Sequence, residues 1–126
     1  MKRIAVLGVL LLAGLTGCAS VRNTSLLDGS RTFGRTELHT YPVRVLAIDG
    51  QYTIDDPLVR VEPGAHVLRV SAPPAVIFTQ PAERDVPFTV QACKRYYLVA
   101  KRDNPYKQDF ELVVQQVETR TDCHSS

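Results

Sequence analysis

Residues 58–70, LVRVEPGAHVLRV, contain two segments of alternating apolar and polar residues on either side of a Pro-Gly pair. Alternation with a period of two is typical of a strand with one buried face, so we expect strands at 58–61 and 66–70. Pro63 presets its own φ and Gly64 tolerates a positive φ, which together favour a type II turn between these strands. The segment therefore indicates a β-rich fold built from short strands and tight turns.

The same pattern extends to both sides of this segment. Asp49-Gly50 is a strong turn signal, and residues 96–100, YYLVA, are the most β-prone run in the chain. Outside the first eighteen residues, no stretch of 11 residues has a helical period. The expected strands cover residues 41–48, 58–61, 66–70, 75–79, 88–90, 96–100 and 110–117, with a polar loop at 80–85. About seven short strands predict an all-β fold, a small antiparallel sandwich.

Length and charge limit both the size of the fold and its partners. The 126 residues suffice for one domain, and 44% apolar with 22% charged residues are ordinary values for a globular chain. Lys2 and Arg3 account for the whole excess of 15 basic over 13 acidic side chains, so the rest of the chain is electrically balanced. Because a balanced chain lacks the broad positive field that attracts nucleic acid, we expect no nucleic-acid partner.

The first eighteen residues have the organisation of a secretory signal. Lys2 and Arg3 precede an apolar run of about twelve residues, shorter than the ~20 that a membrane-spanning helix needs. The run ends in Leu15-Thr16-Gly17-Cys18, which resembles the lipobox of bacterial type II lipoprotein signals. The resemblance implies a signal peptide at 1–17, cleavage after Gly17, and a diacylglycerol thioether with further acylation at Cys18. An ordinary signal peptide with a cysteine near its end is the alternative.

The residue that follows Cys18 bears on localisation. Asp at this position marks retention in the inner membrane of Gram-negative bacteria, whereas this chain has Ala19. The sequence thus resembles the class of lipoproteins sorted to the outer membrane, if the host is Gram-negative. Each buried methylene of an acyl chain contributes about 0.8 kcal/mol to membrane binding, so we expect a protein anchored by lipid and facing the periplasm.

We expect three parts in the chain after the signal. Residues 18–40 are polar, with Leu26-Leu27 as their one apolar pair, and they indicate the lipidated cysteine and a flexible tether. As a coil, the 22 residues after Cys18 would span about 25 Å. The sandwich domain then covers 41–119, and the C-terminal tail covers 120–126. In an alternative reading, 36–39 joins the sheet as a first edge strand.

Cys93 and Cys123 remain once Cys18 is assigned to the lipid. In an oxidising compartment two such thiols most simply form a disulfide, worth about 3.5 kcal/mol for a loop of about 30 residues. Unpaired thiols and intermolecular partners are the alternatives. A metal site that adds His124 lacks Cys-x-x-Cys spacing.

This pairing carries a geometric difficulty. A hairpin that turns at Asn104-Pro105 would place residue 93 opposite residue 116, several residues before Cys123. The Cα atoms of a disulfide lie only about 4.4–6.8 Å apart. We therefore expect the chain to bend after Val117 and curl back, with 119–121 off the ladder.

Residues 45–50, VLAIDG, and 56–70, DPLVRVEPGAHVLRV, together resemble PEGA-type modules. The pair Tyr96-Tyr97 adds a similarity to small envelope lipoproteins of the DUF2846 kind. The resemblance covers about 41–100 and implies an immunoglobulin-like or transthyretin-like sandwich without chemistry of its own. The chain departs from the pattern at Cys93, Cys123 and the long 72–87 connection.

The sequence lacks the common catalytic and metal-binding motifs. It contains no Gly-x-Ser-x-Gly, no His-Glu-x-x-His and no Gly-rich phosphate loop. Asp55 and Asp56 are adjacent in a loop and would point apart, and His66 is interpreted as a strand-start residue that bonds the turn before it. The three histidines, which share no ligand spacing, are His39, His66 and His124. We expect no enzyme activity, no cofactor and no metal.

Tyrosines and basic residues gather around the most β-prone run. They form a candidate binding surface, in which the cations would face phospholipid heads or peptidoglycan and the tyrosines would supply an interface. Its members are Tyr96, Tyr97, Tyr106, Lys94, Arg95, Lys101 and Arg102. In the alternative, the cations only keep a β-rich segment soluble. Because neighbours on a strand point to opposite faces, we expect at least one of Tyr96 and Tyr97 in the core.

These features favour a lipid-anchored, non-enzymatic protein of the cell envelope that binds a protein partner or supports an assembly. A free sheet edge would accept a strand from such a partner. The alternative is a small-ligand or peptidoglycan-binding lipoprotein that uses the tyrosines and the basic strip. An enzyme or redox protein is a third hypothesis, for which the sequence supplies no motif.

Overall fold

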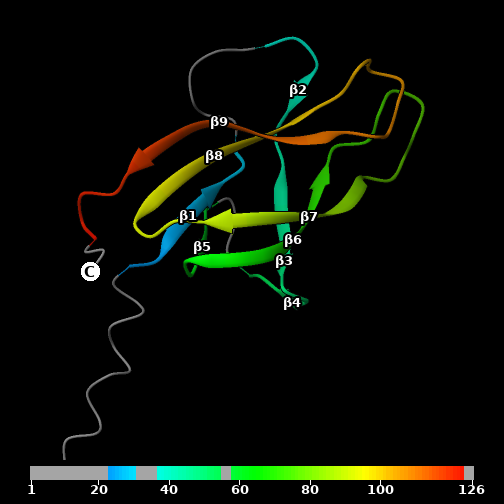
Figure 1. Cartoon of the computed structure of the whole chain (residues 1–126). Helices are drawn as coiled ribbons and strands as arrows, with labels where there is room; N and C mark the ends of the chain where they lie inside the picture. Colours follow the sequence, from blue (N-terminus) through cyan, green and yellow to red (C-terminus); the bar gives the residue numbers. More distant parts are fainter. Residues whose placement is uncertain (1–22, 31–36, 55–57, 124–126) are drawn as a thin grey trace, which may run out of the picture.

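The computed structural model describes residues 23–30, 37–54 and 58–123, which form nine strands in two sheets and no helix (Figure 1). The five-stranded sheet consists of β1 (Ser25–Asp28), β2 (Thr40–Tyr41), β5 (Leu58–Val61), β8 (Lys94–Lys101) and β9 (Glu111–Thr119). The four-stranded sheet consists of β3 (Arg44–Ile48), β4 (Gln51–Tyr52), β6 (Gly64–Ala72) and β7 (Ala82–Val90). The predicted all-β sandwich is confirmed.

Strand β8 organises the five-stranded sheet. It pairs antiparallel with β9 along its whole length, parallel with β1 over its first half, and antiparallel with β2 over its last two residues. Because a strand has only two edges, β1 and β2 share the edge that β9 does not use. Strand β5 extends the sheet by pairing antiparallel with β1, and the other sheet is antiparallel throughout in the order β4-β3-β6-β7.

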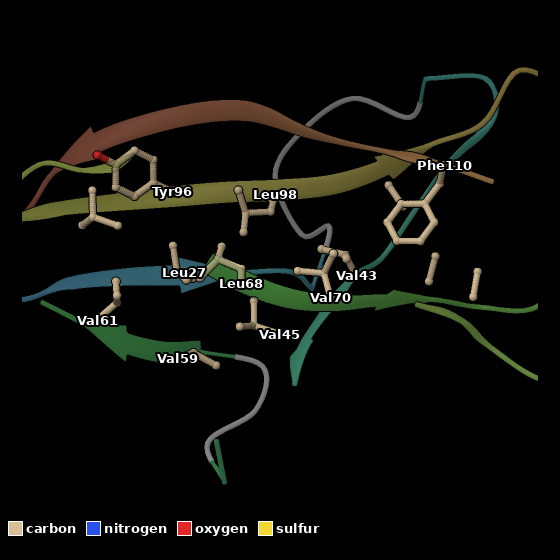
Figure 2. Close-up of a cluster of buried hydrophobic side chains, with 14 residues drawn as sticks. Leu27, Val43, Val45, Val59, Val61, Leu68, Val70, Tyr96, Leu98 and Phe110 are labelled. Atoms are coloured by element: carbon tan, nitrogen blue, oxygen red, sulfur yellow. The ribbon is translucent and has the colours of Figure 1, made fainter. Parts of the chain in front are cut away.

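The inward faces of the two sheets form one hydrophobic core. Leu27, Leu68 and Leu98 are fully buried at its centre and come from β1, β6 and β8 (Figure 2). Along β5, Val59 and Val61 are buried and their neighbours are exposed, as the period-two pattern of the sequence predicts. The core thus depends on side chains from strands that are far apart in the chain.

The tether prediction is wrong for residues 25–28, which form the central strand β1 between β5 and β8. Its polar side chains are buried because they have partners. The Ser25 hydroxyl donates to the Gln91 carbonyl and accepts from the Lys94 N–H at 2.8 Å. Asp28 pairs with Arg95. The described fold therefore begins near residue 23, not at 41. The alternative reading placed an edge strand at 36–39, whereas the structure has the short strand β2 at 40–41.

Three other strand predictions need correction. The expected strand at 41–48 is interrupted after Tyr41, and β3 starts only at Arg44. Residues 75–79 form a turn rather than a strand. Strand β7 begins at Ala82, inside the segment predicted as a polar loop, because its charged residues lie on an edge strand where their side chains reach solvent.

The predicted disulfide is present, with the Cα atoms of Cys93 and Cys123 5.5 Å apart. The predicted register of its hairpin is wrong, because the hairpin is centred at residue 106 and not at Asn104-Pro105, and because Gln115 forms a bulge opposite β8. Lys94 therefore lies opposite Thr119, which is still on the ladder. The chain turns one residue later, where the Arg120 N–H donates to the Cys93 carbonyl at 2.8 Å.

Replacing both cysteines, Cys93→Ser with Cys123→Ser, is expected to lower the free energy of unfolding by about 2–4 kcal/mol without changing the fold. The bridge joins residues that are 30 positions apart, so it lowers the conformational entropy of the unfolded chain. Urea denaturation measures the loss, and circular dichroism checks the fold. Two titratable thiols in the native protein under non-reducing conditions would contradict this pairing.

Candidate functional site

The two tyrosines of the predicted binding surface are both buried, on opposite faces of β8. Tyr96 points into the core, where its ring meets the Phe88 ring edge-on at 5.2 Å and its hydroxyl accepts from the Gln91 N–H at 2.9 Å. Tyr97 points outward and donates to a Glu118 carboxylate oxygen at 2.9 Å. Burial, together with this hydrogen bond, raises the pKa of Tyr97. Neither ring is free to bind a partner.

Arg95 also has a structural role. Its Nη2 lies 2.7 Å from Oδ2 of Asp28, which is 2% exposed, and its guanidinium stacks over the Tyr97 ring at 5.0 Å. Burial acts to raise the pKa of Asp28, but hydrogen bonds from Ser30 and Arg95 outweigh it, so the net pKa is lowered. The pair holds β1 to β8. Lys94 similarly links β8 to β9, because its Nζ donates to the Thr119 hydroxyl at 3.0 Å.

Arg102 is 2% exposed and joins three loops at the far end of β8. Its Nη2 donates to the carbonyls of Pro73 and Gln108 at 2.7 and 3.3 Å. Its backbone N–H donates to the His39 carbonyl at 3.0 Å, and its guanidinium lies over the Tyr41 ring at 5.0 Å. The predicted basic strip is therefore divided, with Arg95 and Arg102 engaged internally and Lys101 exposed.

The loops at 73–81 and 102–110 are also bonded to each other directly. The Val76 N–H donates to the Pro105 carbonyl at 2.9 Å. The Gln108 side chain accepts from the Ala75 N–H at 2.8 Å and donates to the Gln80 carbonyl at 3.0 Å. These bonds cross between loops that are about 30 residues apart in the chain, so they fix the relative position of the two loops.

Large apolar side chains project from these fixed loops into solvent. We call this surface the distal loop platform, and it consists of Val76, Ile77, Phe78 and Tyr106. Their exposed fractions lie between 44% and 73%. Clustered exposed apolar side chains on a rigid base are typical of binding surfaces rather than of a solvated loop. Figure 1 shows the loops at 73–81 and 102–110 side by side, at the opposite end of the molecule from the start of β1.

Sequence reasoning found only Tyr106 among the platform residues. The run AVIF at 75–78 was assigned to a strand because it is apolar and short. Its lack of alternation and its position directly after Pro73-Pro74 are the signals that indicate an exposed loop instead.

Two open hollows lie beside the platform, between the starts of β7 and β9. One has a volume of about 330 Å³, and the other has a volume of about 280 Å³. They share Arg84, Asp109 and Phe110 in their walls, and Lys101 lines the larger one. Charges of both signs surround them, so they can offer polar contacts next to the apolar platform.

The remaining predicted positions are dispersed or lie outside the described residues. His39 is at the platform end, whereas His66 pairs with Asp49 at the other end of the sandwich. Across residues 23–30, 37–54 and 58–123, no three His, Cys, Asp or Glu side chains are grouped to hold a metal ion. Outside the described residues lie Cys18, Asp55, Asp56 and His124.

We expect Arg102→Met to lower the free energy of unfolding by about 2–3 kcal/mol, because two loop carbonyls lose a charged donor that is itself buried. The matched control is Lys101→Met, a neighbouring exposed cation, which should change stability by less than about 0.5 kcal/mol. Urea denaturation gives both values. Amide exchange should also show faster exchange of Val76 in the Arg102 variant. Equal effects of the two substitutions would contradict the structural role of Arg102.

No family model, curated protein or solved structure matches the chain. The part of the chain that the structure describes contains no helix with the length and hydrophobicity needed to cross a bilayer. The features of the chain that bear on function are the distal loop platform and the sequence before β1.

Proposed function

We propose that this chain is a lipid-anchored, non-enzymatic protein of the cell envelope that docks a protein partner through the distal loop platform. The observation that carries the proposal is that internal hydrogen bonds and the buried Arg102 hold four large apolar side chains in solvent. Folding alone does not explain such an arrangement, because exposed apolar surface gains nothing until it is covered. An outer-membrane location, facing the periplasm, follows from the resemblance at Cys18 and from Ala19 in a Gram-negative host.

The position of the proposed anchor supports this orientation. Asn23 is only five residues after Cys18, a stretch that spans at most about 17 Å when fully extended. The chain then enters β1 at the end of the sandwich where Cys93 lies, because Leu26 pairs with Arg95. The platform is at the other end of β8, about 26 Å away along eight residues. A lipid at Cys18 would thus hold one end of the domain near the membrane and leave the platform facing away from it.

The chemistry of the platform favours a protein over a sugar or a small polar ligand. Its side chains are aliphatic and aromatic, they project outward, and the adjoining hollows carry charges of both signs. This combination of an apolar centre and a polar surround is the usual composition of a protein–protein interface. A small-ligand or peptidoglycan-binding protein would instead use the hollow lined by Arg84 and Lys101, which is the competing hypothesis.

The anchor is tested by Cys18→Ser. The substitution is expected to abolish fatty-acid labelling in cells and to leave an uncleaved or mislocalised precursor, because serine cannot form the thioether. Metabolic labelling followed by membrane fractionation measures both effects. Normal labelling of the serine variant would overturn the lipoprotein assignment and leave the platform proposal standing.

The platform is tested by a photoreactive amino acid at position 77 in the full chain, in its native host. We expect a discrete crosslinked protein band that falls at least about tenfold in the variant Val76→Ser with Tyr106→Ser, because an apolar anchor of an interface typically contributes 2 kcal/mol or more. Unfolding free energy should change by less than about 0.5 kcal/mol, since the side chains are exposed.

The matched control places the photoreactive group at position 54 and the serine substitution at Tyr52. Tyr52 and Ile54 are 79% and 96% exposed but lie on the β4 edge, away from the platform. Equal crosslinking from positions 77 and 54 would contradict a specific platform. Binding of purified peptidoglycan that is lost in Arg84→Met but kept in the platform variant would favour the competing hypothesis.

A further inference from the structure

His66 makes two hydrogen bonds at the end of the sandwich opposite the platform, and both of its partners are acceptors. Its Nδ1 lies 2.6 Å from Oδ2 of Asp49, and its Nε2 lies 2.7 Å from the Glu62 carbonyl oxygen. The His66 side chain is 15% exposed, whereas the Asp49 side chain is 51% exposed. The ring is therefore fixed between the turn after β3 and the turn that precedes β6.

The protonation state follows from this geometry. A neutral imidazole has one N–H and one lone pair, whereas an imidazolium has two N–H donors. A carboxylate and a carbonyl can only accept, so both bonds form together only when the ring is protonated. In the neutral form, one ring nitrogen would point its lone pair at an oxygen less than 3 Å away, as these two distances require.

Asp49 transmits the state of His66 to the backbone. It has a positive φ of 51° in the Asp49-Gly50 turn, and its second oxygen, Oδ1, accepts from the Val67 N–H at 2.8 Å. Its own N–H donates to the Val67 carbonyl at 2.8 Å. The carboxylate thus binds one histidine and one backbone donor at once, and it connects the β3–β4 turn to β6.

The other charged groups around His66 act in opposite directions. Glu62 is on the β5–β6 turn and favours the imidazolium. Arg60 on β5 lines the same hollow of about 310 Å³, but its Nη1 donates to the Thr24 hydroxyl at 3.1 Å. On β4 this hollow is lined by the uncharged Gln51 and by the tyrosine hydroxyl of Tyr52, and the residue opposite His66 on β7 is Phe88. Asp49 is therefore the dominant partner.

We propose that His66 is a proton-operated latch that joins the β3–β4 turn to the β5–β6 turn and narrows the hollow between them. Protonation closes the latch through the bonds to Asp49 and Glu62. Deprotonation removes the positive charge and one of these bonds, so the ring no longer joins the two turns and the hollow opens. The device is independent of the distal loop platform, which lies at the other end of the domain.

The hydrogen bonds of His66 determine the direction of the pH effect. The hydrogen bond to Asp49 is the main cause that raises the pKa of His66 above its ordinary value of 6.5, and partial burial opposes it. The same bond lowers the pKa of Asp49, which stays charged. A raised pKa means that the latch contributes its full stability below pH 6.5 and loses it as the pH rises through the folded-state pKa. The window for opening therefore lies above pH 6.5.

The test is an NMR titration of the mature full chain in detergent micelles. The ring signals of His66 should titrate at a higher pH than the same ring in the urea-unfolded chain. Amide-exchange protection of Val67 should fall about three- to tenfold through that same midpoint, because Asp49, which accepts from the Val67 N–H, loses its charge-assisted bond to the imidazolium. In Asp49→Asn, the upward shift of the midpoint and the pH dependence at Val67 should both disappear. Asp85→Asn, an exposed carboxylate paired with Arg69, is the control and should leave both unchanged.

Two results would overturn the latch. One is a folded-state midpoint equal to that of the unfolded chain. The other is a Val67 amide whose protection is constant while the ring titrates. If Asp49→Asn does not fold, His66→Gln provides the second variant, because a glutamine side chain can hydrogen-bond but does not titrate. Its Val67 protection should be independent of pH between 6 and 9, and a retained pH step would contradict the proposal.

Discussion

The pairing of β1 with β8 is the constraint on which the rest of the fold depends. Leu27 occupies the centre of the core only because Ser25 and Asp28 on either side of it have polar partners contributed by residues 91–95. Buried polar groups without partners would cost more than the leucine contributes. Directly after β1 the chain also lies close to the segment before β3, where the Gly29 carbonyl accepts from the Val43 N–H at 2.9 Å. A Cβ at position 29 would lie 1.8 Å from the Val43 carbonyl oxygen, so only glycine permits this contact.

Patterns that are local in the chain predicted the fold well. The strand at 58–61 was predicted with its correct bounds, and the strands around 66–70, 96–100 and 110–117 were found but are longer in the structure. The disulfide was predicted by elimination among three cysteines. In each case, alternation, turn residues or cysteine number is a property of neighbouring residues or of composition. The register of β8 and β9 was wrong because the hairpin turns later than the Asn104-Pro105 pair suggests and because a bulge at Gln115 leaves no clear mark on the apolar pattern.

The errors share a physical cause, which is that a polar residue does not reveal its partner. Ser25 and Asp28 were assigned to a tether, although partners almost 70 residues away make them suitable for a buried strand. Arg95 and Arg102 were placed on a binding surface, yet one neutralises Asp28 and the other donates to loop carbonyls. The opposite error was made for the apolar residues 76–78, which were assigned to a strand but are exposed in a loop. The exposure of Ile77 depends on how two loops are bonded together, which the local sequence does not reveal.

The parallel pairing of β1 with β8 has a mechanical consequence. With a lipid at Cys18 and a partner on the distal loop platform, a pull on the envelope would act on the start of β1 and on the far end of β8. Because the two strands run in the same direction, these forces are opposed along the strand axis. The hydrogen bonds between them are then loaded together, as in shear, and do not open one after another as in a zipper. The Arg120 side chain donates to the Thr24 carbonyl, and the Cys93 N–H donates to the Asn23 carbonyl. The segment closed by the disulfide is therefore also bonded to residues 23 and 24, directly before β1, where the force would be applied. With both proposed attachments in place, the parallel pairing would resist tension along the strand axis.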